Sequence, residues 1–143
     1  MREREKLVES MVTFVPMLHK KVVKSLPPCE LSKLQFELLF KICKNNGKPM
    51  SYYSEKMMMP RSNLTVLSDK LIEERLIERL PDPVDRRVIS LKLTTKGEHY
   101  IAEQRTKIGA QMMKLLAQLN DEDVIRLNSL IEEMKSILNK IIN

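Results

Sequence analysis

Residues 79–97 read RLPDPVDRRVISLKLTTKG, and this stretch decides the fold. Its two prolines, Pro81 and Pro83, each fix φ and remove a backbone donor, so a helix cannot continue through them and a turn is favoured. The β-forming side chains of residues 88–93 then fit a short strand. The stretch predicts a β-hairpin with a charged tip, in which residues 76–80 form the first strand.

Amphipathic helices are predicted on both sides of this hairpin, because apolar residues recur there at helical spacing. Ser32 forms a capping box with Gln35, Ser51 and Asn120 suit N-caps, and Thr94 or Thr95 can cap the helix after the hairpin. Pro16 should kink or split the first helix. The helices are expected at about residues 3–25, 32–45, 51–57, 60–75, 95–119 and 121–142.

The third and fourth of these helices are short and are joined by only a few residues, which predicts a helix-turn-helix. A basic hairpin directly after it is the layout of a winged helix, whose wing can reach the minor groove of DNA. We therefore expect a mainly α fold: a winged helix-turn-helix with a two-stranded β-wing and N- and C-terminal dimerisation helices. The expected division is 1–30, 31–97 and 98–143, within one integrated domain.

Composition agrees with a globular protein that meets a polyanion. The chain has 143 residues, 43% hydrophobic and 31% charged, with a net charge of +6. The charge is +5 over residues 1–49, +2 over residues 50–97 and −1 over the remainder. A basic first two-thirds suits a surface that binds nucleic acid. The plainer interpretation is that many soluble proteins are basic.

Other functional classes find little support in the sequence. Two cysteines without a CxxC or Cys/His cluster predict a reducing, cytoplasmic setting and no metal. No apolar run approaches the length of a membrane span. A nucleophile with a plausible base and a phosphate-cradling glycine loop are both missing, so neither an enzyme nor a cofactor is expected.

The first helix and the last two helices carry apolar stripes that one subunit cannot cover. Helices that flank a small winged domain commonly pair with a second copy, so a two-fold homodimer is expected.

The run LIEERLIER at residues 71–79, followed by DRR at 85–87 and LKLTTKG at 91–97, resembles the MarR family of bacterial transcriptional regulators. The resemblance extends over essentially the whole chain. It implies a homodimer that binds pseudo-palindromic operator DNA, acts as a repressor and is released by a small aromatic or phenolic ligand. Where the family commonly has Lys-Gly after the recognition helix, this chain has Glu74-Arg75, so the helix is expected to end differently and to change the direction of the wing.

The resemblance also implies the site. Residues 61–70 would form the recognition helix, in which Arg61 suits guanine, Asn63 adenine, and Thr65 or Val66 a thymine methyl. Arg87 matches the family's wing arginine, and Asp85 matches the carboxylate that orients it. The full set of expected DNA contacts is Ser51, Tyr52, Arg61, Ser62, Asn63, Thr65, Val66, Lys70, Arg86 and Arg87.

An effector cleft is expected from the same resemblance, bordered by Val22, Leu26, Cys29, Leu31 and Phe36. Three plainer interpretations stay open. The polar face of residues 61–70 also suits a solvated helix, the wing arginines also suit protection of a strand edge, and a winged helix also suits protein contact without DNA. A further alternative is a redox-sensing regulator acting through Cys29, which lies near a helix N-terminus.

Overall fold

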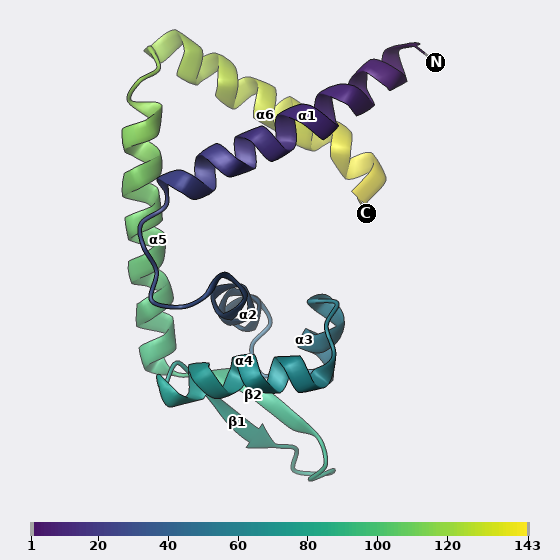
Figure 1. The fold of residues 1–143 in the computed structure, drawn as a ribbon, viewed down its shortest axis with the longest axis vertical. Helices are drawn as coiled ribbons and strands as arrows, with labels where there is room; N and C mark the ends of the chain where they lie inside the picture. The colour runs from purple at the N-terminus through teal and green to yellow at the C-terminus, as the bar shows by residue number, and fades with distance from the viewer. Residues whose placement is uncertain (1, 143) are drawn as a thin grey trace. The chain divides into compact units, whose positions relative to one another are not determined.

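The computed structural model describes residues 2–142 and confirms a mainly α fold with a two-stranded wing (Figure 1). The predicted elements are all present, with ends that differ by a few residues from those expected. Their bounds are α1 Arg2–Ser25, α2 Lys33–Lys44, α3 Met50–Lys56, α4 Arg61–Glu73, β1 Ile77–Pro81, β2 Ile89–Leu93, α5 Thr95–Leu116 and α6 Asp121–Ile142.

The chain forms two compact units. One consists of residues 28–106 and contains α2, α3, α4, the wing and the first half of α5. The other joins the residues up to 27 with those from 107 onward, and so contains α1, the second half of α5 and α6. We call them the winged unit and the helical unit.

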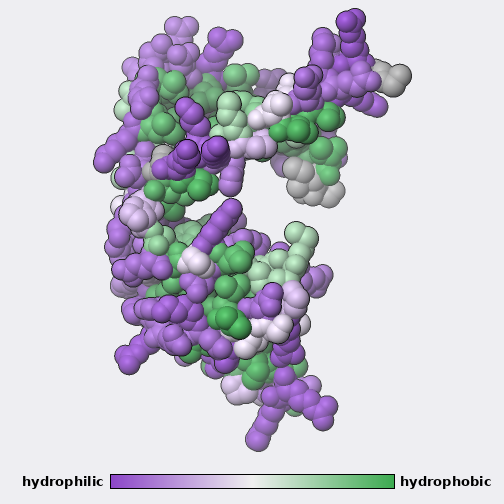
Figure 2. All heavy atoms as spheres, in the orientation of Figure 1, coloured by the Kyte–Doolittle hydropathy of each residue, from purple (hydrophilic) through white to green (hydrophobic). Residues whose placement is uncertain are grey.

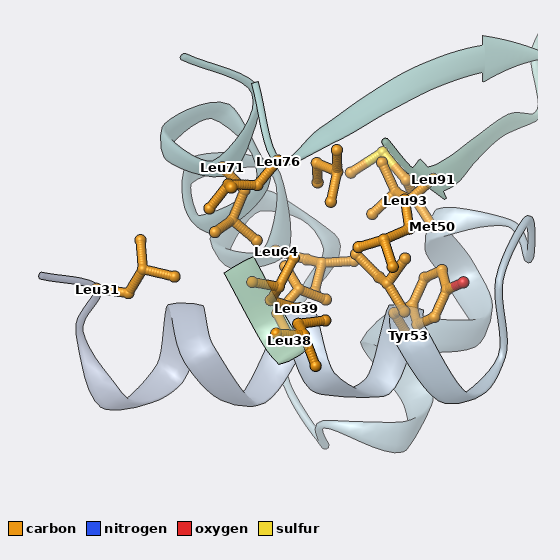
Figure 3. Close-up of a cluster of buried hydrophobic side chains, with 13 residues drawn as sticks. Leu31, Leu38, Leu39, Met50, Tyr53, Leu64, Leu71, Leu76, Leu91 and Leu93 are labelled. Carbon is orange, nitrogen blue, oxygen red and sulfur yellow. The ribbon is translucent and has the colours of Figure 1, made fainter. Parts of the chain in front are cut away.

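The winged unit has a continuous hydrophobic core (Figure 3). Side chains of α2, α3 and α4 meet those of the wing strands there, and most are fully buried. Tyr53 is buried, and its hydroxyl accepts the Lys48 N–H at 3.2 Å and donates to the Asn45 carbonyl. Burial raises the pKa of this phenol. The core consists of Leu31, Leu38, Leu39, Ile42, Met50, Tyr53, Leu64, Leu71, Leu76, Ile77, Leu91, Leu93 and Ile101.

Three of the predicted caps are confirmed. Ser32 and Gln35 form a reciprocal capping box on α2. The Thr94 hydroxyl accepts the Gly97 N–H at 3.0 Å, and the Asn120 side chain accepts the Asp123 N–H at 2.7 Å.

The cap predicted at Ser51 is wrong. The N-cap of α3 is Pro49, whose backbone is extended, and it makes no side-chain cap hydrogen bond. The helix begins at Met50, which is buried in the core, so Ser51 lies within the first turn. Packing of Met50 accounts for this earlier start.

The helical unit contains two long amphipathic helices. α1 continues through Pro16 as one helix, so the predicted split is wrong. Many large apolar side chains of α1 and α6 are exposed, and Figure 2 shows such hydrophobic residues on this unit. Among the described residues, none of α1 or α6 is buried.

The two strands form the antiparallel wing. Ile77 pairs with Leu93, Arg79 with Leu91 and Pro81 with Ile89. Because side chains alternate between the faces of a strand, Ile77, Arg79 and Pro81 share one face and Glu78 and Leu80 the other. The strand pair therefore carries the hairpin tip, residues 82–88, away from its buried end at Ile77.

Candidate nucleic-acid interface

The exposed face of α4 presents the polar residues predicted to read bases. Arg61, Ser62 and Asn63 lie in its first turn and are exposed, while Leu64 and Leu71 on the other side enter the core. The Thr65 hydroxyl donates to the Arg61 carbonyl at 2.9 Å. The hydroxyl hydrogen is thereby engaged with the backbone, so the side chain can offer a partner only its hydroxyl oxygen, as an acceptor, and its methyl group. Val66 is 70% exposed, so its apolar side chain is accessible on the surface of α4.

Helix α3 precedes α4 and presents Ser51 and Tyr52. Ser51 is exposed and Tyr52 is half-buried. The Lys56 ammonium lies 5.7 Å from the centre of the Tyr52 ring, and the Tyr53 ring meets that ring edge-on at 5.4 Å between centres. Lys56 was not predicted as a site residue, although its four-residue spacing from Tyr52 was a signal for this contact. Together, Tyr52 and Lys56 place an aromatic hydroxyl and a cation on one side of α3.

The turn between α3 and α4 is closed by local hydrogen bonds. The Ser54 hydroxyl donates to the Met59 carbonyl at 2.6 Å, and the Met59 N–H donates to the Ser54 carbonyl at 3.1 Å. Met58 has φ of +50° and is 94% exposed. An L-residue in this left-handed region carries strain of about 1 kcal/mol, so the turn is held by the residues around it.

The wing tip is organised by two carboxylates. Asp82 accepts the backbone N–H groups of Val84 at 2.8 Å and Asp85 at 2.9 Å, and these bonds lower the pKa of its carboxyl. Asp85 in turn accepts the backbone N–H of Arg87 at 3.0 Å. Asp85 thus acts on the backbone at the position of the wing arginine. The structural role of Asp82 was not predicted, although an aspartate between two prolines is a common turn former.

Both tip arginines, Arg86 and Arg87, are exposed. The wing tip is the hydrophilic projection of the winged unit seen at the bottom of the view in Figure 2. No salt bridge joins either arginine to a carboxylate within the described residues. Their charges are therefore available to an anionic partner.

Helix α4 ends in a left-handed residue, although that residue is not glycine. Arg75 has φ of +59°. Its N–H donates to the Ile72 carbonyl at 2.9 Å, and the Leu76 N–H donates to the Leu71 carbonyl at 2.9 Å. This pair of bonds is a Schellman motif. The chain therefore keeps the turn that glycine would favour and enters β1 directly from it.

Lys70 differs from the other predicted DNA contacts because carboxylates surround it. Its ammonium lies 3.1 Å from a Glu74 oxygen and 3.9 Å from a Glu73 oxygen, and the hydrogen bond to Glu74 raises its pKa. These neighbours compensate its charge at the C-terminal end of α4. It also lines a cavity of about 180 Å³ together with Leu31, Glu74, Leu76, Lys96 and Tyr100. A phosphate contact by Lys70 stays a prediction.

The residues predicted to border an effector cleft are distributed over both units. Val22 and Leu26 belong to the helical unit, and Cys29, Leu31 and Phe36 to the winged unit. Within the winged unit, the exposed Cys29 thiol lies 3.3 Å from the Tyr100 hydroxyl. Burial and this thiol raise the pKa of Tyr100. Leu31 is in the core, and Phe36 packs against it.

The chain is similar to known proteins over the segment that contains this geometry. Residues 31–89 match the model of the MarR family. This matched segment, which includes α2, α3, α4 and β1, is similar to the MarR family. The exposed side of α4 and the first part of the wing, which make up most of the candidate interface, lie inside the matched segment.

Curated relatives are regulators of the same helix-turn-helix type. The chain is 32% identical over 94 residues to the uncharacterized HTH-type transcriptional regulator YhbI of Bacillus subtilis, covering 64% of this chain and 61% of YhbI. The chain therefore spans less than two thirds of that relative. It is 25% identical over 130 residues to the HTH-type transcriptional repressor MdtR of B. subtilis, covering 88% of this chain and 84% of MdtR.

Solved MarR-family structures share the fold. A mutant of MarR from E. coli superposes with a TM-score of 0.71 at 24% identity, covering 85% of this chain and 93% of that one. The same mutant complexed with operator DNA gives a TM-score of 0.63 at 23% identity, covering 89% and 94%. No helix described in residues 2–142 has the length and hydropathy to cross a membrane. Among those residues, no cluster of His, Cys, Asp and Glu could hold a metal ion.

Proposed function

We propose that this chain is a sequence-specific DNA-binding transcriptional regulator that acts as a homodimer and represses its target genes. The observation that carries the proposal is the exposure of Arg61, Asn63 and Val66 in the N-terminal half of α4, in the same compact unit as a wing whose two tip arginines form no salt bridge among the described residues. The operator-bound structure of a MarR-family fold supports the same conclusion.

The proposed mode of binding follows from the chemistry of each side chain. The N-terminal part of α4 enters the major groove, where Arg61 donates two hydrogen bonds to guanine and Asn63 pairs with adenine. Thr65 and Val66 offer methyl groups to thymine. Ser51, Tyr52 and Lys56 on α3 contact phosphates, which set the register of the helix on the duplex. Arg87 enters the narrow minor groove, where the potential is most negative.

The homodimer is supported by the exposed stripes of the helical unit. Val124, Leu127 and Ile131 lie on one stripe of α6, and α1 carries a similar set of exposed apolar residues. Monomeric proteins rarely leave such extended apolar surface in water. A two-fold dimer places two recognition helices on half-sites separated by about 34 Å, one turn of the duplex.

Release by a small aromatic anion completes the proposal. A ligand that binds better to a dimer with a different spacing of recognition helices shifts the population away from the DNA-bound form. Val22, Leu26, Cys29, Leu31 and Phe36 are the proposed borders of its site. Titration of the protein–DNA complex with phenolic carboxylates tests this step, and a complex that no such compound dissociates contradicts it.

The experiment for DNA binding begins with a duplex selected from a random-sequence pool by the full-length wild-type protein. Asn63→Ala should weaken binding to this duplex by about 1–3 kcal/mol and relax the preference at one base pair in each half-site. Ser129→Ala, at an exposed position of α6, is the matched control and should bind like the wild type. Failure to enrich any duplex, or salt-insensitive binding, contradicts the proposal and favours a protein-interaction module.

A second candidate is a redox-sensing regulator of the same fold. The observation that favours it is the exposed Cys29 thiol beside the Tyr100 hydroxyl. Under this candidate, peroxide weakens DNA binding by the wild-type protein and leaves the binding of Cys29→Ser unchanged. An identical oxidant response in the two proteins removes the candidate.

A further inference from the structure

We propose that Arg79 is a positioning residue that fixes the wing against the recognition helix α4, through the exposed side chain of Asp69. This inference rests on the proposed function and assigns to a strand residue a role that neither the α4 face nor the wing tip supplies.

The contact joins two elements that are ten residues apart in the sequence. One guanidinium nitrogen of Arg79, on β1, donates to a carboxylate oxygen of Asp69, on α4, at 2.6 Å. The same nitrogen lies 3.2 Å from the Ser68 hydroxyl oxygen, and the Ser68 hydroxyl donates to the Thr65 carbonyl at 2.9 Å. Arg79 therefore reaches the backbone of the recognition helix, next to its base-reading residues, through one bridging hydroxyl.

This contact supplies a further point of attachment for the wing, on strand β1. The first is at its base, where the Thr94 hydroxyl donates to the Arg75 carbonyl at 2.7 Å and lies 3.1 Å from the Leu76 carbonyl. At the strand rise of about 3.3 Å per residue, Arg79 lies about 10 Å farther along the chain than Leu76. Strand β2 is held separately by the segment before α3, where the Gly47 N–H donates to the Leu91 carbonyl and the Leu91 N–H donates to the Lys48 carbonyl, each at 3.0 Å. The Arg79–Asp69 pair attaches the other strand, β1, to α4, so that both strands of the hairpin are fixed in direction. The direction of the hairpin in turn sets the direction in which Arg86 and Arg87 project from its tip.

The pair is poorly placed to serve stability. The side chains of Arg79 and Asp69 are 37% and 50% exposed, and exposed ion pairs contribute little to the free energy of unfolding. Ser68 is fully buried, but it keeps its bond to Thr65 when Arg79 is removed, so no buried hydroxyl loses its only partner. Variants at either position should therefore fold.

Asp69 offers a test in which two explanations predict opposite signs. It lies four residues after Thr65 on the exposed side of α4, so its negative charge faces the same direction as the proposed DNA contacts. If the pair had no positioning role, Asp69→Asn would remove a charge that repels phosphate and strengthen binding. If Arg79 positions the wing through Asp69, the same change weakens binding.

The experiment uses the full-length protein and the duplex selected by the wild type, at one fixed salt concentration. Asp69→Asn is expected to weaken binding about fivefold, and the double variant Asp69→Asn/Arg79→Gln to bind no more weakly than Arg79→Gln alone, because both changes break one contact. Asp69→Glu keeps the carboxylate and should restore most of the affinity. Glu78→Gln removes an acidic charge from the opposite face of β1 and is the matched control, expected to bind at least as tightly as the wild type.

A second measurement reports the DNA contacts of the wing separately from those of α4. Hydroxyl-radical footprinting reports minor-groove protection, which Asp69→Asn should reduce at the outer flanks of the duplex while the protection over the half-sites remains. The thermal unfolding midpoint should stay within a few degrees of the wild-type value. Unchanged or tighter binding by Asp69→Asn, or uniform loss of the whole footprint, overturns the positioning role. If the wild type selects no duplex, the proposed function itself fails, and this inference fails with it.

Discussion

The winged unit and the helical unit use amphipathic helices in different ways. In the winged unit, the apolar sides of α2 and α4 enter a shared core, where Leu38, Leu39 and Leu64 are fully buried. In the helical unit, α1 and α6 have equally regular apolar stripes, yet Leu130 remains 52% exposed. An amphipathic pattern thus predicts that a face will be covered, but it does not tell whether the same chain covers it.

This difference in burial suits the two units to different roles. The winged unit has the core it needs to present a rigid surface, because each fully buried leucine contributes about 1.5–3 kcal/mol relative to an exposed one. The helical unit leaves comparable apolar groups exposed, and the proposed homodimer would cover them with a second copy of the chain. This difference supports the proposal that the winged unit contacts DNA and the helical unit forms the dimer.

The largest expected effect is a loss of dimerisation and DNA affinity, and it tests the proposed role of the helical unit. Ile131→Glu places a charge in the exposed stripe of α6 and should convert the dimer to a monomer, as measured by sedimentation equilibrium. Since two linked half-site contacts gain about 10²- to 10⁴-fold over one, binding to the selected duplex should fall by at least about 100-fold. Ser129→Glu adds the same charge off the stripe and should leave both properties unchanged. A dimer that survives Ile131→Glu would move the interface elsewhere.

The next effect concerns the core of the winged unit. Leu39→Ala should lower the free energy of unfolding by about 2–5 kcal/mol, because it removes buried methyl groups and leaves a cavity. Val66→Ala truncates an exposed apolar residue of the same unit and should change it by less than about 0.5 kcal/mol. Urea unfolding of both variants measures the contrast. Equal costs for the two would contradict the burial that distinguishes them.

A smaller effect is expected at the end of α4. Arg75 occupies a left-handed conformation that glycine adopts without strain, and it takes part in the hydrogen bonds described above through its backbone N–H and carbonyl groups. Arg75→Gly should raise the free energy of unfolding by about 0.5 kcal/mol, since relief of strain exceeds the added entropy of the unfolded chain. Thermal unfolding with Lys92→Gly as a control, at an exposed strand position, checks the sign. A loss of stability in Arg75→Gly would show that its side chain supports the turn.

The smallest effect is a pH dependence of the wing tip. The pKa of Asp82 is lowered by the N–H groups of Val84 and Asp85, so the folded tip favours the carboxylate. Its stabilisation is present above the ordinary pKa of aspartate and is lost as the pH falls through the lowered value. The amide resonances of Val84 and Asp85 should shift in that acidic range and should not do so in Asp82→Asn. Identical titrations in both proteins would contradict this role of Asp82.

Local rules were sufficient for much of the fold. The capping box at Ser32, the cap at Asn120 and the hairpin after Pro81 depend on residues close together in sequence, and each was predicted. Ser51 was predicted wrongly because the start of α3 depends on burial of Met50, which involves distant residues.

In the candidate site, too, some features follow from residues close together in sequence and others depend on distant residues. The outward face of α4 follows from helical periodicity, and exposure of Arg61, Asn63 and Val66 agrees with it. The bond between Arg79 and Asp69 could not be predicted, because the sequence does not give the distance between a strand residue and a helix residue. The pairing of Lys70 with Glu74 was accessible from their four-residue spacing and shows how a predicted DNA contact can instead be compensated within its own helix.

The most direct measurement compares two duplexes that differ only in the separation of their half-sites. The first is the duplex selected by the wild-type protein, and the second carries an insertion of about five base pairs, half a turn, between the half-sites. Two recognition helices held by one symmetric dimer should lose about 100-fold in affinity for the second duplex, because only one of them can then reach its half-site. Equal affinity for the two duplexes would contradict the account.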